Sequence, residues 1–212
     1  MDSAPSLTTF PSDLLRLILG LLPGYAGPLR EVCQQWRTIV ANLRLGSMSL
    51  SDLSRRGHAD LLAWARDLWP EGYPQEVAGK IMANAALGGF TVCMELAGGW
   101  GATNYNEAAG EAALGGHEAC MELAKGWGAT NYDRAMASAA KGGHADCMNL
   151  AKGWGATDYD WAMIHAAEGG YEACMNLAKD WGATGYDQAM AFAAEGGHMA
   201  CIELAKDWGA AD

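Results

Sequence analysis

Residues 130–156 read TNYDRAMASAAKGGHADCMNLAKGWGA, and closely related 27-residue stretches fill most of the C-terminal two-thirds of the chain. A pair of glycines, a cysteine and a Trp-Gly-Ala signature return at every step. The cysteines are Cys93, Cys120, Cys147, Cys174 and Cys201, and the tryptophans are Trp100, Trp127, Trp154, Trp181 and Trp208. A fixed period of about 20–50 residues is typical of stacked units that bury their apolar faces only against their neighbours. The sequence therefore predicts a repeat solenoid.

Each unit holds two short helices. Asp133 is a suitable N-cap for a first helix over residues 134–141, and Gly142 and Gly143 can end that helix by supplying a left-handed backbone. A second helix is expected from about residue 144 to 152–154, followed by Gly155. Alanine, leucine and methionine favour helix, and two helices leave no room in the unit for an ordinary strand. The predicted fold class is all-α.

One half of the first helix is nearly constant between units, with alanine and methionine at Ala135, Met136, Ala139 and Ala140. The opposite half changes freely. Its variable positions recur at spacing i, i+4 and i+7, and the third position holds Leu87, Leu114, Lys141, Glu168 and Glu195. We name the first two positions, which are the candidate binding residues, the first-helix stripe: Lys80 and Asn84, Glu107 and Glu111, Arg134 and Ser138, Trp161 and His165, Gln188 and Phe192. Chemical variety on a constant scaffold suits recognition, and Trp and Arg are favoured at protein interfaces. The alternatives are neutral drift, or packing of Trp161 and Phe192 beneath a neighbouring helix.

The outer positions of the second helix use a small polar alphabet. Asn149 and Lys152 represent it, and the pattern predicts a plain solvated surface. The tyrosine at each step, such as Tyr132, is expected just before the N-cap, where it would brace turns between units.

The cysteines and histidines are expected to be structural. His117 and Cys120, His144 and Cys147, and His198 and Cys201 have the spacing of two ligands on one helical turn. A structural zinc needs four converging ligands, and rungs about 8–10 Å apart are too distant for a disulfide or a shared metal. We therefore expect free thiols, no metal and no cofactor.

The charge is concentrated in the repeats. Residues 1–102 carry 9 acids and 8 bases, whereas residues 103–212 carry 16 acids and 6 bases, a net charge of -10. Such a surface repels nucleic acid and favours a partner with a basic surface. No signal peptide or membrane span is evident, because the apolar run at 14–22 is short and contains Arg16. The expected location is the cytoplasm.

The unit over residues 76–212 resembles the ankyrin repeat, with its alanine-rich first helix, Gly-His turn, second helix and closing Gly-Ala. Five units are present, and a degenerate unit with a linker fills residues 46–75, where Gly57-His58 and Trp69 echo the signature. Each unit is six residues shorter than the usual 33. The missing part is the β-hairpin of the family, so any binding role moves to the first-helix face.

Residues 6–45 do not fit the period and resemble an F-box. The matching positions are Pro11, Leu14, Leu15, Ile18, Leu19, Leu22, Pro23, Leu29, Arg30, Val32, Cys33, Trp36 and Arg37. The resemblance implies a helical module that binds the Skp-type adaptor of a cullin–RING ubiquitin ligase through Pro11, Leu14, Leu15, Ile18, Leu22, Pro23, Leu29, Val32 and Trp36. The alternative is that these helices only cap the solenoid.

Three functions follow from these patterns. The first is a substrate-receptor subunit of an SCF-type ligase, in which the repeats hold a target; the combination resembles proteins of large DNA viruses, which would place it in host cytoplasm. The second is a plain interaction scaffold or decoy. The third, an enzyme, is disfavoured because no nucleophile elbow, zinc motif or phosphate loop is present. The last unit keeps the apolar pattern of the others, so self-association through that end is a further possibility.

Overall fold

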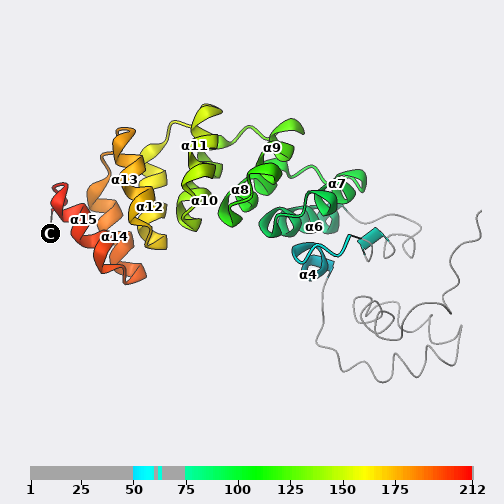
Figure 1. The fold of residues 1–212 in the computed structure, drawn as a ribbon, viewed down its shortest axis with the longest axis horizontal. Helices are drawn as coiled ribbons and strands as arrows, with labels where there is room; N and C mark the ends of the chain where they lie inside the picture. Colours follow the sequence, from blue (N-terminus) through cyan, green and yellow to red (C-terminus); the bar gives the residue numbers. More distant parts are fainter. Residues whose placement is uncertain (1–49, 60–61, 64–74, 212) are drawn as a thin grey trace, which may run out of the picture.

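The computed structural model describes residues 50–59, 62–63 and 75–211, and every regular element in this part of the chain is a helix. A short helix, α4 (Leu50–Arg55), comes before five helix pairs (Figure 1). The pairs are α6 (Gln75–Gly88) and α7 (Thr91–Gly99), α8 (Tyr105–Gly115) and α9 (Glu118–Gly126), α10 (Tyr132–Gly142) and α11 (Ala145–Gly153), α12 (Tyr159–Gly169) and α13 (Glu172–Asp180), and α14 (Tyr186–Gly196) and α15 (Met199–Asp207). The predicted all-helical repeat solenoid is confirmed.

The pairs stand side by side in a curved row (Figure 1). The first helices, α6, α8, α10, α12 and α14, line its inner side and pack closely on one another. The second helices lie on the outer side, where each contacts its neighbours far less. The curvature follows from this difference, since the row is held tightly along one layer and loosely along the other.

Small side chains bring the first helices together. Ala135, Ala139 and Ala140 are fully buried in α10, and the matching alanines of α12 are buried as well. Met136 of α10 and Met148 of α11 are also fully buried. Alanine permits close approach of helix backbones, and the flexible methionine side chain fills the remaining gaps. The constant half of the first helix is therefore the core.

Glycine pairs close each first helix. Of the two glycines predicted to supply a left-handed backbone after the first helix, only Gly143 does so, with φ of 80°; the prediction was wrong for Gly142, which is the last residue of α10. Gly142 needs no side chain for a different reason: a β-carbon there would collide with the carbonyl oxygen of Leu114 and lie 2.7 Å from the ring of His144. A ring stands at this place in every unit, namely Phe90, His117, His144, Tyr171 and His198. The histidines near the cysteines thus pack against backbone.

The start of the first helix differs from the prediction. Helix α10 begins at Tyr132, and Asn131 is its N-cap, because the Asn131 side chain accepts a 3.0 Å hydrogen bond from the backbone N–H of Arg134. The assignment of Asp133 as the cap was wrong. Tyr132 accordingly follows the cap instead of preceding it.

Asp133 links its unit to the next. Its Oδ1 accepts hydrogen bonds from the backbone N–H groups of Thr157 and Asp158, at 2.7 and 3.0 Å. We call this contact the Asx clasp. Asn106, Asp160 and Asp187 make equivalent contacts 24 or 25 residues further along the chain. The first unit has Gly79 at this position, and there Asn104 of the second unit instead donates to the Gly79 carbonyl oxygen at 3.1 Å.

The lysine of the second helix lies over the aromatic pair of the next unit. The Nζ of Lys152 is 4.3 Å from the ring centre of Trp181 and 5.4 Å from that of Tyr159, and those two rings stand 5.6 Å apart. Lys125 and Lys179 make similar contacts. The expectation of a plain solvated role for Lys152 was therefore wrong, since a cation over an aromatic ring is attracted by the ring's negative face.

Part of the predicted degenerate unit is described. Helix α4 packs against α6 as consecutive first helices do elsewhere in the row. Gly57 has φ of 74° and lies against the ring of Phe90, much as Gly89 lies against that of His117. Trp69 and the F-box-like residues of 6–45 lie outside the described residues.

We expect Asp133→Ala to lower the free energy of unfolding by about 1–2 kcal/mol, because two backbone N–H groups lose a charged acceptor. Asp133→Asn is the matched control, since Asn106 already makes the same contact in another unit. Urea unfolding followed by circular dichroism would measure both. Equal stability of the two variants would contradict a role for the clasp.

A second prediction separates two glycines. Gly142→Ala should cost about 2 kcal/mol or more, because the added methyl group meets the Leu114 carbonyl and the His144 ring. Gly153→Ala, where nothing lies within 4 Å of the added carbon, should instead stabilise the chain by about 0.5 kcal/mol. Thermal unfolding of both variants beside the wild type provides the measurement, and a neutral Gly142→Ala would argue against the close approach.

Candidate functional site

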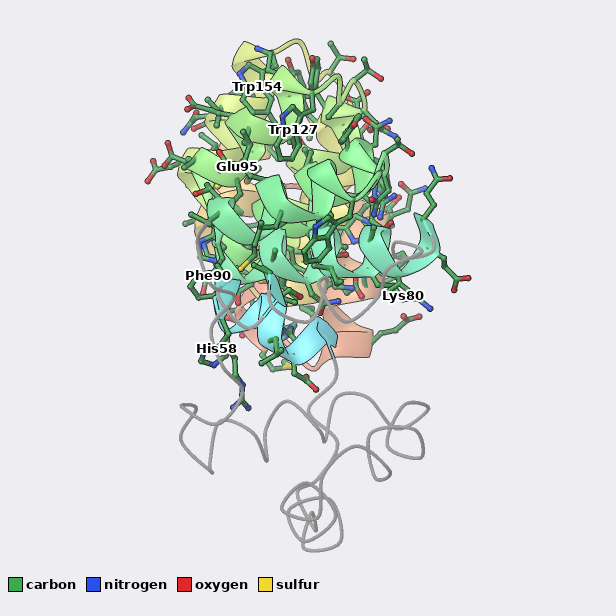
Figure 2. The ribbon with its side chains drawn as sticks, turned by 90° about the vertical axis from the view of Figure 1, so that its right-hand side faces the viewer. His58, Lys80, Phe90, Glu95, Trp127 and Trp154 are labelled. Carbon is green, nitrogen blue, oxygen red and sulfur yellow. The ribbon has the colours of Figure 1, made fainter. Side chains whose placement is uncertain are left out.

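The stripe residues lie on the successive first helices α6, α8, α10, α12 and α14. At its first position in each helix, Lys80, Glu107, Trp161 and Gln188 are exposed, whereas Arg134 is partly buried. At its second position, Asn84, Glu111, Ser138 and His165 are partly buried and Phe192 is exposed. Figure 2, which looks along the row, places Lys80 on one side of the molecule, Phe90 and His58 on another, and Trp127 and Trp154 on a third. Lys80, the stripe residue labelled there, thus lies apart from the labelled ring positions, Phe90 and His58, and from the tryptophans of the Trp-Gly-Ala signature.

The aromatic members of the stripe remain at the surface. Trp161 and Phe192 retain 37% and 38% of their possible exposure, so neither is packed beneath a neighbouring helix. The ring of Trp161 leans on His165, with ring centres 5.5 Å apart and planes inclined by 60°. The alternative in which these side chains belong to the core is therefore excluded by the structure.

Four of the predicted residues meet in one hollow between α10 and α12. Arg134 and Ser138 line it from one helix, and Trp161 and His165 line it from the other. Ala137 and Lys141 complete the lining, and the volume is about 350 Å³. We call this the central hollow. It combines an aromatic wall with cationic and hydroxyl groups, which suits a mixed polar and apolar ligand.

Glu168 holds one side of the central hollow in place. Its two carboxylate oxygens pair with the Nζ of Lys141 at 2.6 Å and with the Nδ1 of His165 at 2.8 Å. The hydrogen bond from Lys141 is the main reason that the pKa of Glu168 lies below its usual value, and the His165 contact adds to this effect. Lys141 and His165 are therefore oriented before any ligand arrives.

Arg134 is placed differently. Its side chain lies over Gly110 of α8, where a β-carbon would be 3.3 Å from the guanidinium Nε. None of the described carboxylates forms an ion pair with it. Glu111 interacts with it at longer range: burial raises the pKa of Glu111, repulsion from Glu107 raises it further, and Arg134 and Arg55 oppose both.

A second hollow, of about 380 Å³, lies where the clasp is missing, between α6 and α8. Two stripe residues, Lys80 and Glu107, line it, together with Gln75, Glu76, Gly79, Thr103 and Asn104. Lys80 is already paired with Glu76 at 2.7 Å. Asn104 donates to Glu107 at 2.8 Å, while its own Oδ1 is buried without a partner among the described residues. The polar groups that line this second hollow thus largely bond to one another.

The remaining stripe residues, Asn84, Glu111, Gln188 and Phe192, line neither hollow. Conversely, Lys141 and Glu168 stand at the third variable position of the same helix face, seven residues after Arg134 and Trp161, but were not among the predicted binding residues, and neither was Ala137. The ion pair between Lys141 and Glu168 joins two units, so it could not be inferred from the sequence of one unit.

The repeat cysteines are buried and weakly reactive. The five described cysteines are free and buried, and burial raises the pKa of Cys120, Cys147 and Cys174 to about 11. A thiol with such a pKa is a poor nucleophile at neutral pH. Within the described ranges, no three His, Cys, Asp or Glu side chains gather as a metal site would require, and no helix is both long and apolar enough to cross a bilayer.

Comparison with known proteins supports the fold. No protein-family model matches the chain, and no curated protein matches it. Among solved structures, the ankyrin repeat domain of human ASB11 is similar, with a TM-score of 0.54 and 20% sequence identity. The match covers 76% of this chain and 84% of that one. At this identity the likeness shows the fold alone: the repeat region is an ankyrin-like helical solenoid.

The buried thiols provide a test of the packing. At pH 8 we expect Cys120, Cys147 and Cys174 of the native protein to react with iodoacetamide about 100-fold more slowly than in urea, because a pKa raised from 9.0 to about 11 leaves that much less thiolate. Cys201, near the end of the row, should react ahead of them. Peptide-resolved mass spectrometry would follow each site, and native rates equal to those in urea would refute the packing.

Proposed function

We propose that this chain is a non-catalytic protein-binding scaffold whose first-helix stripe contacts a target. The observation that carries the proposal is the arrangement of chemically variable side chains along one face of a row whose core positions are nearly constant. Trp161, Phe192 and Arg134 are on this face, and such side chains commonly dominate binding energy at interfaces. The ankyrin-like fold is consistent with this role.

The finer proposal is that the chain is the substrate receptor of an SCF-type ubiquitin ligase. Its support is the F-box-like pattern of residues 6–45, which would dock a Skp-type adaptor while the repeats hold the target. The similarity of this combination to proteins of large DNA viruses suggests action in a host cytoplasm. A scaffold or decoy without ligase activity is the alternative.

The charge supports a protein partner and disfavours nucleic acid. With 16 acids and 6 bases over residues 103–212, the repeats attract a partner with a basic surface.

Self-association is a separate proposal. In the last pair, Ala194 is exposed and Met190 and Ile202 are partly covered, although their counterparts in the preceding unit are buried. A concentration series in analytical ultracentrifugation would test pairing through this face.

The receptor role is tested with the full chain and a purified Skp-type adaptor. We expect stable binding by the wild type and loss of binding in Leu15→Asp, because a carboxylate would replace an apolar contact of the F-box-like pattern. Trp161→Ala should bind the adaptor normally. If the folded wild type does not bind, the receptor role is wrong and the scaffold alternative stands.

The stripe is tested by co-purification from eukaryotic cells with quantitative mass spectrometry. Partners of the wild type should be lost together in the double variant Trp161→Ala, Phe192→Ala. Asn149→Ala, on the exposed side of a second helix, is the control and should retain them. Equal recovery by both variants would show that targets bind elsewhere.

A further inference from the structure

The bases of the repeats are not spread evenly over the row. Residues 103–212 contain six, and four of them, Lys125, Lys152, Lys179 and Lys206, lie near the ends of second helices. Only Arg134 and Lys141 belong to first helices in this region, and both line the central hollow. Within residues 103–212 the first helices thus have their positive groups at one place, beside the exposed Trp161, and the remaining stripe cation, Lys80 of α6, is already paired with Glu76.

From this arrangement we infer that the central hollow binds a single acidic side chain of a partner segment, together with a large apolar side chain next to it in that segment. The inference rests on the proposed function, and it specifies which kind of partner segment binds to the first-helix stripe. The carboxylate would be held by Arg134, and the apolar neighbour would pack on Trp161.

The geometry of the cationic side fits a carboxylate. Arg134 has no ion pair with a described residue, so its planar guanidinium can donate two parallel hydrogen bonds to a carboxylate. Ser138 belongs to the same lining, and its hydroxyl lies against Gly110 beside the Arg134 Nε, where it can donate one more hydrogen bond to a carboxylate held by Arg134. Lys141 adds positive charge at a position fixed by Glu168.

The aromatic side fits an apolar group. Trp161 is 37% exposed, and its contact with His165 holds the ring at the edge of the hollow. The buried Ala137 forms part of the lining, and its small side chain leaves space between the two helices. A volume of about 350 Å³ accommodates one large side chain and a carboxylate but not a folded element.

Neighbouring charges limit the ligand to one acid. Glu107 and Glu111 stand on α8, on the side of Arg134 away from Trp161, and Glu168 lies beside Lys141. A run of several carboxylates, or a phosphate backbone, would meet these groups and be repelled. A segment with one Asp or Glu, basic or neutral flanks and an adjacent Leu, Phe or Trp avoids that repulsion.

The test is selection of peptides from a random 12-residue display library on the full chain. We expect the selected peptides to share one acidic residue beside a large apolar one. A synthetic peptide of this sequence should lose affinity about 10-fold or more for Arg134→Ala and for Trp161→Ala. Replacing its acid by the amide should cause a similar loss on the wild type and little further loss on Arg134→Ala.

Controls separate this inference from the function on which it rests. Gln188→Ala alters the stripe outside the central hollow and should keep the affinity within about 2-fold, as expected for a position outside the contact. Thermal unfolding checks that all variants remain folded. Peptides that lack an acid, or that bind Arg134→Ala and Trp161→Ala as tightly as the wild type, would overturn the inference while leaving peptide binding established. A library that yields no binder would count against both proposals.

Discussion

Close contact between alanine-rich first helices is the constraint on which this structure depends. A 27-residue unit has no hairpin to separate it from its neighbour, so the spacing of the row is set by how nearly two helix backbones can approach. Helices α10 and α12 pack on one another, and their alanines, such as Ala139 and Ala166, are fully buried, as are Met136 and Met163. The glycine pairs serve the same requirement, because Gly142 lies where any side chain would strike the preceding unit.

The sequence predicts what lies within one unit. Helix pairs, the left-handed Gly143 and the buried cysteines follow from propensity, spacing and period, and each is found in the structure. Two polar residues, Asn131 and Asp133, compete for the role of N-cap, and local rules favour the one nearer the apolar run. Asn131 is the N-cap in the structure, because the Asp133 carboxylate instead accepts a hydrogen bond from the backbone of the following unit.

Apart from the N-cap, the features that the sequence did not predict are contacts between different units. Lys152 looks like a surface lysine until the following Trp181 is placed 4.3 Å beneath its Nζ. In the same way, the helical spacing aligns Arg134 with Ser138, but only the packing of α10 on α12 brings them to Trp161. Contacts that depend on the angle and distance between repeats are not encoded in the pattern of a single repeat. The F-box-like module of residues 6–45 lies outside the described residues and stays a prediction.

The Asx clasp joins successive units in a way that does not depend on their stripe side chains. Its three complete junctions use the same backbone donors and an Asn or Asp acceptor, whatever side chains the stripe carries. Units are therefore interchangeable as building blocks, and duplication or reshuffling of the gene segment would preserve the joint. Such an event would change the order of the stripe side chains along the inner face. Arg134 and Trp161 occupy the same position in consecutive units, and the two side chains are neighbours only because these two units follow one another.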